Sequence, residues 1–348
     1  MKRVGLDLGG TYIKGGVVDE ENRIIARGAT PTMAEREAEE IIRDMAALVK
    51  KLTEEAGITL RDIAGIGIGS PGTIDAGSGK VLYSNNIRWE NVPLAELLEK
   101  MLAEDAGCGV IKVRVSNDAN CAALGELVCD TDSGVQSAIL LTLGTGVGSG
   151  IILNGKLYEG EQPGGAELGH MVICHGGRQC SCGGKGCLEA YVSASALVED
   201  ARQAAREAEN SVLRTLAGEE LMYLPEERNQ QAAMGELAEK KQDILCGLNG
   251  KHVIEAVRQK DPTAVKVFEQ YLEYLGCGIV NIINIFRPEV IYLGGGICEG
   301  FDLMEETLQK YVKENCFGGE IAAVAQIKKA AHGDDAGIIG DAELIDLT

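Results

Sequence analysis

The stretch Asp7-Leu8-Gly9-Gly10-Thr11 decides how the amino-terminal part of the chain is interpreted. It separates two short apolar runs, residues 3–8 and 11–18, and such a pattern is typical of a β-hairpin. A carboxylate closes the first run, and the glycines allow a ligand to approach the turn closely. The turn amides and the Thr11 hydroxyl can donate hydrogen bonds to phosphate oxygens. A plain hairpin with glycines in its turn is the alternative interpretation.

The same pattern recurs later in the chain. An offset of 135 residues superposes Leu8 on Leu143 and Gly9 on Gly144, so Leu143-Gly144-Thr145-Gly146 forms a second glycine turn. Two equivalent hairpins predict a duplicated α/β fold with a cleft between two lobes. Chance alignment of glycine-rich strands is the alternative.

Apolar spacing predicts an alternation of strands and helices on both sides of this repeat. Residues 192–286 are mostly helical in pattern, and a helix is expected to begin after Asn117. The other expected elements are helices over 34–56, 94–103, 264–285, 301–314 and 334–346, strands over 23–29, 62–68, 111–116, 289–293 and 321–327, and a loop through Gly79.

Composition narrows the class of protein. The 348 residues include 33 Lys and Arg against 53 Asp and Glu, which gives a formal net charge of −20 and argues against nucleic acid as a partner. The amino terminus has no apolar signal region, and the uncharged stretch from Ser133 to Gly155 fits strand–turn–strand better than a membrane span. A secreted disulfide framework is not expected from eleven cysteines in a chain of this length. We therefore expect a reducing, cytoplasmic environment.

Residues 67–72 formally match the dinucleotide motif G-x-G-x-x-G. That motif requires a helix to open after the glycines, because the pyrophosphate sits on the helix N-terminus. A loop pattern follows instead, so a Rossmann site is not expected. The P-loop pattern is absent from the sequence.

The strongest chemical signal is a set of potential metal ligands. His170, Cys180, Cys182 and Cys187 supply one imidazole and three thiolates within a short stretch. Four protein ligands leave no open position on zinc, so the ion would be structural. Cys174 and His175 are rival ligands, and free thiols in a reducing cell are the alternative.

Three carboxylates stand near these motifs. Glu167 precedes His170 and Glu189 follows Cys187, so a metal would fix both and let them orient a polyhydroxylated ligand; solvated side chains are the alternative. Asn117-Asp118 lies where a strand meets a helix. It is either a helix cap or a carboxylate able to accept a proton from a hydroxyl.

Taken together, these segments resemble the ROK family (repressors, open reading frames, sugar kinases). The resemblance covers nearly the whole chain and rests most specifically on Glu167-Leu168-Gly169-His170 and on the Cys-x-Cys-x4-Cys-Leu-Glu run that ends at Glu189. The other matching stretches are Asp7–Thr11, residues 67–73, Ser116–Asn120, Leu143–Gly150 and Gly294–Gly296.

This resemblance implies an actin-like (ribonuclease H-like) duplicated fold and an ATP-dependent sugar kinase. Asp118 would be the catalytic base, and His170 would bind zinc through one ring nitrogen and the sugar through the other. Mg²⁺ would bridge phosphate oxygens, with a contribution from Asp7 directly or through water. The remaining sugar-binding residues would be Gly72, Thr73, Asn117, Glu167 and Glu189, and the nucleotide would meet Asp7, Gly9, Gly10, Thr11, Gly144, Thr145, Gly146, Gly294, Gly295 and Gly296.

Other expectations follow from the same resemblance. The 6-hydroxyl of glucose is the expected acceptor, with N-acetylmannosamine, N-acetylglucosamine, fructose and allose as alternatives. A sugar-sensing transcriptional repressor is disfavoured because no helix-turn-helix precedes residue 7. A homodimer is expected, with sugar and ATP as ligands and no membrane partner.

The expected domain boundary lies at residue 118. Residues 1–118 would form the amino-terminal lobe, to which a carboxy-terminal helix over about 334–348 returns. Residues 119–333 would form the second lobe, with the metal loop at 170–187 and a helical insertion over about 199–260. Within that insertion, 218–250 looks longer than the family's usual connection and is expected to form surface helices without a catalytic role.

Overall fold

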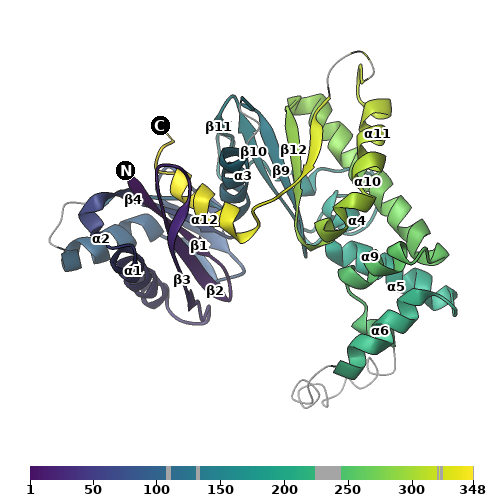
Figure 1. Ribbon diagram of the computed structural model, residues 1–348, viewed down its shortest axis with the longest axis horizontal. Helices are drawn as coiled ribbons and strands as arrows, with labels where there is room; N and C mark the ends of the chain where they lie inside the picture. Colours follow the sequence, from purple (N-terminus) through teal and green to yellow (C-terminus); the bar gives the residue numbers. More distant parts are fainter. Residues whose placement is uncertain (107–110, 131–133, 224–243, 320, 322–323, 348) are drawn as a thin grey trace.

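The computed structural model forms two lobes, each built on a five-stranded sheet with its own buried apolar cluster (Figure 1). The predicted two-lobed α/β fold is therefore confirmed. No helix in the part of the chain that the structure describes is long and apolar enough to cross a membrane. The described residues are 1–106, 111–130, 134–223, 244–319, 321 and 324–347.

The sheet of the amino-terminal lobe has the strand order β3-β2-β1-β4-β8. Strands β3, β2 and β1 are antiparallel neighbours, whereas β4 and β8 run parallel to β1. Helix α1 (Ala38–Glu55) packs on this sheet because its large apolar residues recur at helical spacing and are buried, Ile41, Met45 and Leu52 among them. The strands are β1 (Lys2–Leu8), β2 (Tyr12–Val18), β3 (Ile24–Pro31), β4 (Ile63–Ser70) and β8 (Val113–Asn117), and α2 (Leu94–Ala106) packs beside α1.

The second sheet repeats the first, with the order β11-β10-β9-β12-β13 and the same sequence of antiparallel and parallel neighbours. The two hairpins that the 135-residue offset relates, β1–β2 and β9–β10, occupy the same place in the two sheets. The strands are β9 (Ala138–Leu143), β10 (Val147–Leu153), β11 (Lys156–Leu157), β12 (Val290–Gly294) and β13 (Gln326–Lys329).

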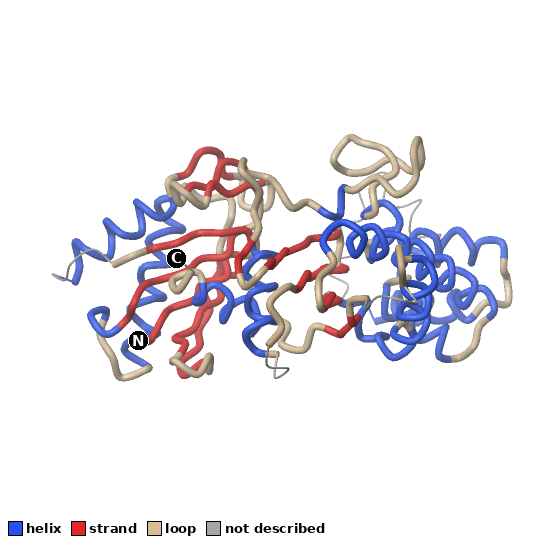
Figure 2. Tube along the Cα trace, turned by 90° about the horizontal axis from the view of Figure 1, so that it is seen from above, coloured by secondary structure: helices blue, strands red, loops and turns tan. Residues whose placement is uncertain are grey.

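Helices gather at the far side of this second lobe (Figure 2). The longest, α10 (Pro262–Phe286), is capped by Asp261 and buries an apolar stripe that packs against α4, α5, α9 and α11. The others are α4 (Glu189–Val192), α5 (Ala194–Glu207), α6 (Val212–Tyr223), α9 (Gly250–Arg258) and α11 (Glu305–Asn315), with short 3-10 turns η1 (Leu60–Asp62), η2 (Leu168–His170), η3 (Ile244–Gly247) and η4 (Gly296–Leu303).

The helix that follows the last strand of each sheet packs on the other sheet. Helix α3 (Asp118–Cys129) follows β8 but packs on β9 and β10, and α12 (Asp334–Glu343) follows β13 but packs on β1 and β4. The two helices also cross each other closely, because a Cβ on Gly340 would lie 1.7 Å from the carbonyl oxygen of Cys121 and one on Gly125 would lie 1.9 Å from that of Ala336. These crossed helices connect the lobes.

The glycines of residues 67–72 serve this packing. A Cβ on Gly67 would lie 1.6 Å from the carbonyl oxygen of Asp341 in α12, so only glycine permits this approach. The chain then enters strand β5 (Thr73–Asp75) and not a helix. The segment is thus a contact with α12 and not a dinucleotide motif.

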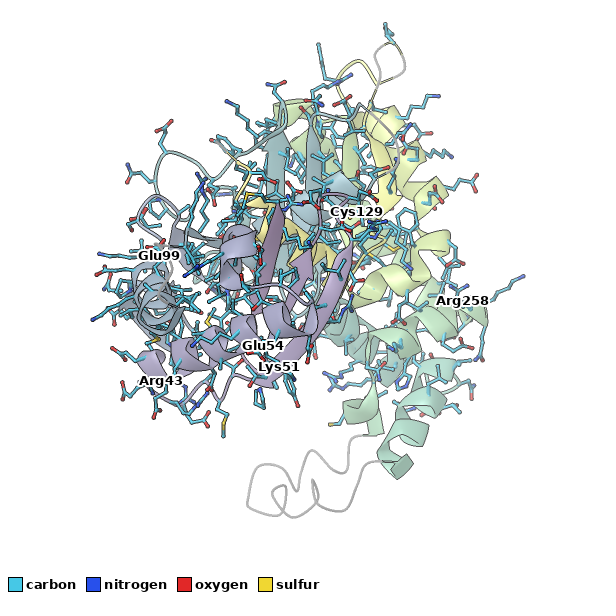
Figure 3. The ribbon with its side chains drawn as sticks, turned by 60° about the vertical axis from the view of Figure 1, so that its left-hand side comes forward. Arg43, Lys51, Glu54, Glu99, Cys129 and Arg258 are labelled. Carbon is cyan, nitrogen blue, oxygen red and sulfur yellow. The ribbon has the colours of Figure 1, made fainter. Side chains whose placement is uncertain are left out.

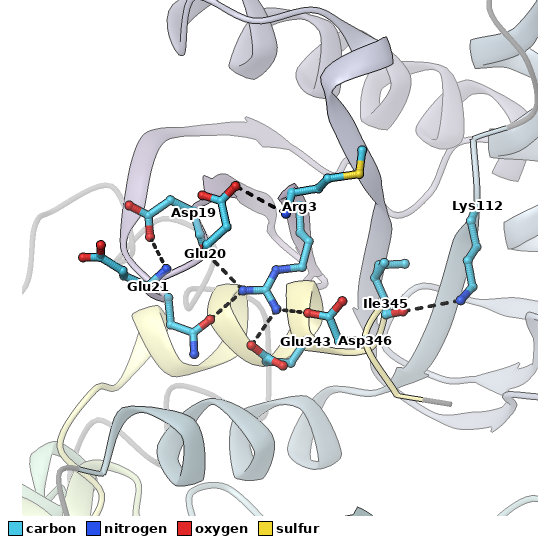
Figure 4. Close-up of polar contacts among 10 residues, drawn as sticks. Arg3, Asp19, Glu20, Glu21, Lys112, Glu343, Ile345 and Asp346 are labelled. Atoms are coloured by element: carbon cyan, nitrogen blue, oxygen red, sulfur yellow. Dashed lines mark hydrogen bonds and ion pairs between the residues drawn. The ribbon is translucent and has the colours of Figure 1, made fainter.

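Arg3 fastens the start of β1 to the end of α12 (Figure 4). Its side chain is buried and donates hydrogen bonds to the carboxylates of Glu343 and Asp346, to the Asp19 carbonyl and to Asn22 Oδ1. These hydrogen bonds satisfy the two terminal nitrogens of the buried guanidinium, while its Nε has no partner among the described residues.

The structure corrects three details of the expected element order. The expected loop through Gly79 is wrong: a small sheet forms there from β5, β6 (Lys80–Ser84) and β7 (Trp89–Val92). The strand expected over 321–327 begins only at Gln326, and the helix expected over 301–314 is divided between η4 and α11. The centre of the expected surface helices, 224–243, lies outside the described residues.

Candidate functional site

A cavity of about 620 Å³ lies between the lobes. It is built from the ends of β1, β4 and β9, from the starts of α3 and α12, and from the metal loop. The expected site residues that line it are Asp7, Gly72, Asp118, Gly144, Thr145, Gly146, Glu167, His170 and Glu189.

Asp118 occupies the first position of α3. Asn117 caps this helix by accepting a hydrogen bond from the Ala119 N–H, at 2.9 Å, and its amide donates to the Gly72 carbonyl oxygen at 3.1 Å. The cap interpretation of Asn117 is therefore confirmed, and the cap directs the next side chain, Asp118, into the cavity. Burial raises the pKa of Asp118 above its ordinary value.

Asp7 reaches the cavity from the end of β1. Its pKa is raised to about 6, mainly by burial and then by the nearby Asp118 carboxylate, while Lys14 acts in the opposite direction. Lys14 itself is paired with Asp334 at 2.7 Å. The floor of the cavity thus holds two carboxyl groups that are costly to ionise together, which favours a cation between them and an anionic ligand.

Glu167 stands at a strained point of the chain. The preceding Ala166 has a positive φ of 65°, and the Ser149 hydroxyl holds it by donating to the Ala166 carbonyl oxygen at 2.6 Å and accepting from the Leu168 N–H. Non-glycine residues adopt this conformation only where the surroundings enforce it. Burial raises the pKa of Glu167, whereas the neighbouring His170 lowers it.

Glu189 connects the glycine turn of the second lobe to the metal loop. One carboxylate oxygen accepts from the Val147 N–H at 3.0 Å, and the other accepts from the Ser181 hydroxyl at 2.6 Å. Burial alone would raise its pKa, but these hydrogen bonds lower it overall. Glu189 is therefore held as an ionised carboxylate beside Gly146, on which a Cβ would lie 2.5 Å from its oxygen.

The four expected metal ligands converge. The ligand atoms of His170, Cys180, Cys182 and Cys187 all lie within 4.8 Å of one another. The Cys182 and Cys187 sulfurs are 3.7 Å apart, as are the Cys180 sulfur and His170 Nδ1. Tetrahedral zinc with bonds of about 2.0–2.3 Å places its ligand atoms roughly 3.5–3.8 Å apart. The set therefore fits zinc, and neither of the rival residues Cys174 and His175 belongs to it.

The remaining expected residues lie around the cavity. Thr73 and Asn117 line an adjoining cavity of about 280 Å³, which shares Gly72 and Glu167 with the first. The turn at Gly9–Thr11 approaches Asn86, a residue of the first cavity's wall. Gly295 has a φ of 95°, and a Cβ on it would lie 2.3 Å from the Leu143 carbonyl oxygen, so Gly294–Gly296 stands beside the second glycine turn.

Sequence reasoning missed Asn86 and Asp334, both of which line the larger cavity. Asp334 could have been found from the duplication, because α12 is the counterpart of α3 and both begin with an aspartate. Asn86 gave no local signal, since it lies in the turn between β6 and β7, where the sequence predicted no element.

Comparisons with known proteins agree with this geometry. The model of the ROK family matches residues 3–347. The glucokinase of Streptomyces coelicolor is 33% identical over 98% of this chain and 96% of its own, and that of Thermotoga maritima is 32% identical over 99% and 97%. The crystal structure of a ROK family glucokinase from Streptomyces griseus in complex with glucose and AMPPNP has 34% identity and a TM-score of 0.73 over 99% of both chains. This chain belongs to the ROK family.

Proposed function

We propose that this protein is an ATP-dependent hexose kinase that transfers the γ-phosphate to the 6-hydroxyl of glucose. The observation that carries the proposal is the position of Asp118, a carboxylate that opens into the same cavity as the turn at Gly144–Gly146 and as Glu167 and His170. The similarity to glucokinases and to a structure that holds glucose and AMPPNP supports both ligands.

We assign the sugar to the wall formed by Gly72, Thr73, Asn117, Glu167, His170 and Glu189. Carboxylates, an imidazole and a side-chain amide together provide the acceptors and donors that ring hydroxyls need. Because Nδ1 of His170 faces the cysteines, Nε2 remains for the sugar. The strained backbone at Ala166 and the double hydrogen bonding of Glu189 keep these groups in place before the sugar arrives.

Asp118 then acts as the base. Its carboxylate accepts the proton of the 6-hydroxyl as the hydroxyl oxygen attacks the γ-phosphorus in line, and the bond to the bridging oxygen of ADP breaks. Burial strengthens this carboxylate as a base because a raised pKa increases its proton affinity. Closure of the lobes around both substrates would exclude water from the transfer.

We assign ATP to the two glycine turns. Gly10 and Thr11 on one side, and Thr145 and Gly146 on the other, would present backbone amides to the phosphates, with Gly294, Gly295 and Gly296 near the adenosine. Gly9 and Gly144 close the two turns, because their N–H groups donate to the carbonyl oxygens of Tyr12 and Gly146. Mg²⁺ would be held at Asp7, directly or through water, and would neutralise phosphate charge when bound. The wall otherwise carries several carboxylates, so ATP needs this neutralisation.

We assign structural zinc to His170, Cys180, Cys182 and Cys187, whose spacing fits four-coordination. Its role would be to hold His170 and, through the loop, Glu189. We propose a cytoplasmic location, because none of the ten described cysteines forms a disulfide, which is compatible with a reducing environment. We also propose that the protein is a homodimer, which a molar mass from light scattering tests. Its reaction would belong to carbohydrate metabolism, and to glycolysis if glucose is the substrate.

A coupled assay of ADP release tests the proposed activity. Glucose, N-acetylglucosamine, N-acetylmannosamine, fructose and allose are compared at fixed MgATP, and glucose should give the highest kcat/KM. A higher value for an N-acetylhexosamine or for fructose would reassign the sugar while keeping the kinase. Absence of sugar-dependent ADP release with every sugar would contradict the kinase itself and would favour a sugar sensor.

A further inference from the structure

A third cavity, of about 370 Å³, lies between the lobes beside the 280 Å³ cavity that Thr73 and Asn117 line. Its walls come from β8 of one sheet, from the β10–β11 turn of the other, and from the turn that follows α12. Strands β8 and β11 are the edge strands of their sheets, so the cavity lies where the two sheets' edges face each other. The proposed sugar, ATP and metal sites do not use this cavity.

Two cations line this cavity. Arg114 pairs in register with Gly67, whose missing Cβ faces α12, so the Arg114 side chain points to the same face of the sheet. Lys156 follows the turn Asn154-Gly155, in which both residues have positive φ, a conformation that fixes a tight hairpin. Neither side chain has a hydrogen bond or ion pair with any other residue that the structure describes.

The acids in the same wall are already engaged. Glu159 accepts hydrogen bonds from the Ser116 hydroxyl at 2.5 Å and from the Asn120 amide at 3.3 Å. Asp346 is paired with Arg3, as Figure 4 shows. Glu159 keeps its negative charge because both donors are neutral, so the wall holds two cations without an acidic partner among the described residues and one carboxylate held in place by hydrogen bonds.

The rest of the wall is largely apolar. Val115, Leu157, Leu344 and Leu347 line it together with Ala76. A small inorganic anion would contact the two cations but not the apolar side chains. An anion with an organic body would contact the cations and the apolar wall together. A phosphate monoester of a small metabolite has both parts.

We infer that this cavity is a regulatory site for an organic phosphate, bound by Arg114 from one lobe and Lys156 from the other. The choice of ligand rests on the proposed function. The first candidate is the hexose 6-phosphate that the proposed kinase reaction produces. Arg114 precedes Asn117 by three residues on β8, and Lys156 precedes Glu159 of the sugar cavity by three. A phosphate that holds both cations would restrain the relative motion of the lobes and slow turnover without occupying the cleft.

Calorimetry tests the site with the cleft filled by saturating glucose and AMPPNP, so that only binding elsewhere gives heat. The probes are glucose 6-phosphate and inorganic phosphate. The wild-type chain should bind one equivalent of glucose 6-phosphate, and the double variant Arg114→Gln with Lys156→Gln should bind it at least about tenfold more weakly, because two charge-assisted contacts are lost. The matched control is Arg43→Gln with Lys51→Gln, which removes the same charge from α1 (Figure 3) and should bind as the wild type does.

Three results of the calorimetry would overturn the inference. No heat with the wild-type chain, or equal loss in both double variants, would show that no specific site exists. Equal affinity for both probes would contradict an organic ligand. Glucose turnover is measured separately: normal turnover without this binding contradicts only the regulatory site, whereas Arg114-dependent binding without turnover contradicts only the proposed kinase.

Discussion

The two hairpin turns at the cleft have the same backbone role and different chemistry. The offset that superposes Gly9 on Gly144 places Asp7 of the first turn on Thr142 of the second. Asp7 is a half-buried carboxyl whose pKa is raised to about 6, whereas Thr142 cannot ionise in this range. The two lobes thus share the hairpin geometry, while only the first contributes a carboxyl group at this position.

The crossed helices show a similar division. Asp118 and Asp334 begin equivalent helices and line the same cavity, but their surroundings differ. Asp118 has a pKa raised by desolvation and no ion-pair partner among the described residues, whereas the Asp334 side chain is 71% exposed and paired with Lys14. Position alone therefore does not make a base; an unpaired carboxyl with a raised pKa beside Glu167 and His170 does.

The largest expected effect tests that distinction. Asp118→Asn removes the proposed base, so kcat for glucose should fall by roughly 10²–10⁴-fold while sugar binding stays measurable by calorimetry. Asp334→Asn removes the same charge from the same cavity and should leave kcat close to the wild-type value. Equal losses in the two variants would mean that the total charge of the cavity matters and that Asp118 is not the base.

Metal removal tests how far the second lobe depends on its metal loop. Cys182→Ser with Cys187→Ser should lose the zinc and raise KM for glucose by roughly 10–100-fold, because His170 and Glu189 lose their support. KM for ATP should change much less. Cys174→Ser is the matched control, since that thiol lies outside the ligand set, and it should keep one zinc per chain by elemental analysis. Zinc loss in the control alone would reassign the ligands.

The sequence predicts those features of the fold and the site that leave a short-range pattern in the chain. Gly9, Gly144 and the apolar runs around them identify both hairpins, and the His170–Cys187 spacing identifies the metal ligands, because turns and chelation impose short-range patterns. The small sheet over β5–β7 has strands of three to five residues, too short to show a period. The position of Asn86 in the cavity wall arises only when distant segments pack together, so no local pattern reveals it, and Asp334 can be found only through the duplication.

The raised pKa of Asp7 predicts a cost in stability. Because its pKa rises from 3.8 to about 6 on folding, the folded state binds more protons between about pH 4 and 6, and stability decreases as the pH rises through that window. Asp7→Asn should therefore gain up to about 3 kcal/mol at pH 7.5, and less at pH 4, in urea unfolding. Thr142→Val, at the equivalent position, should have the same effect at both pH values. A pH-independent effect of Asp7→Asn would contradict the shifted pKa.

The smallest expected effect concerns the helix crossing that both lobes share. Gly340→Ala places a methyl group 1.7 Å from the Cys121 carbonyl oxygen, so α12 must move away from α3 at a cost of about 1–3 kcal/mol. Gly337→Ala lies on the same helix with no atom within 4 Å of the new Cβ, and it should stabilise the protein by about 0.5–1 kcal/mol through helix propensity. Urea midpoints should thus move in opposite directions. If Gly340→Ala were stabilising as well, the two helices would not be in close contact, and the connection between the lobes would have to lie elsewhere.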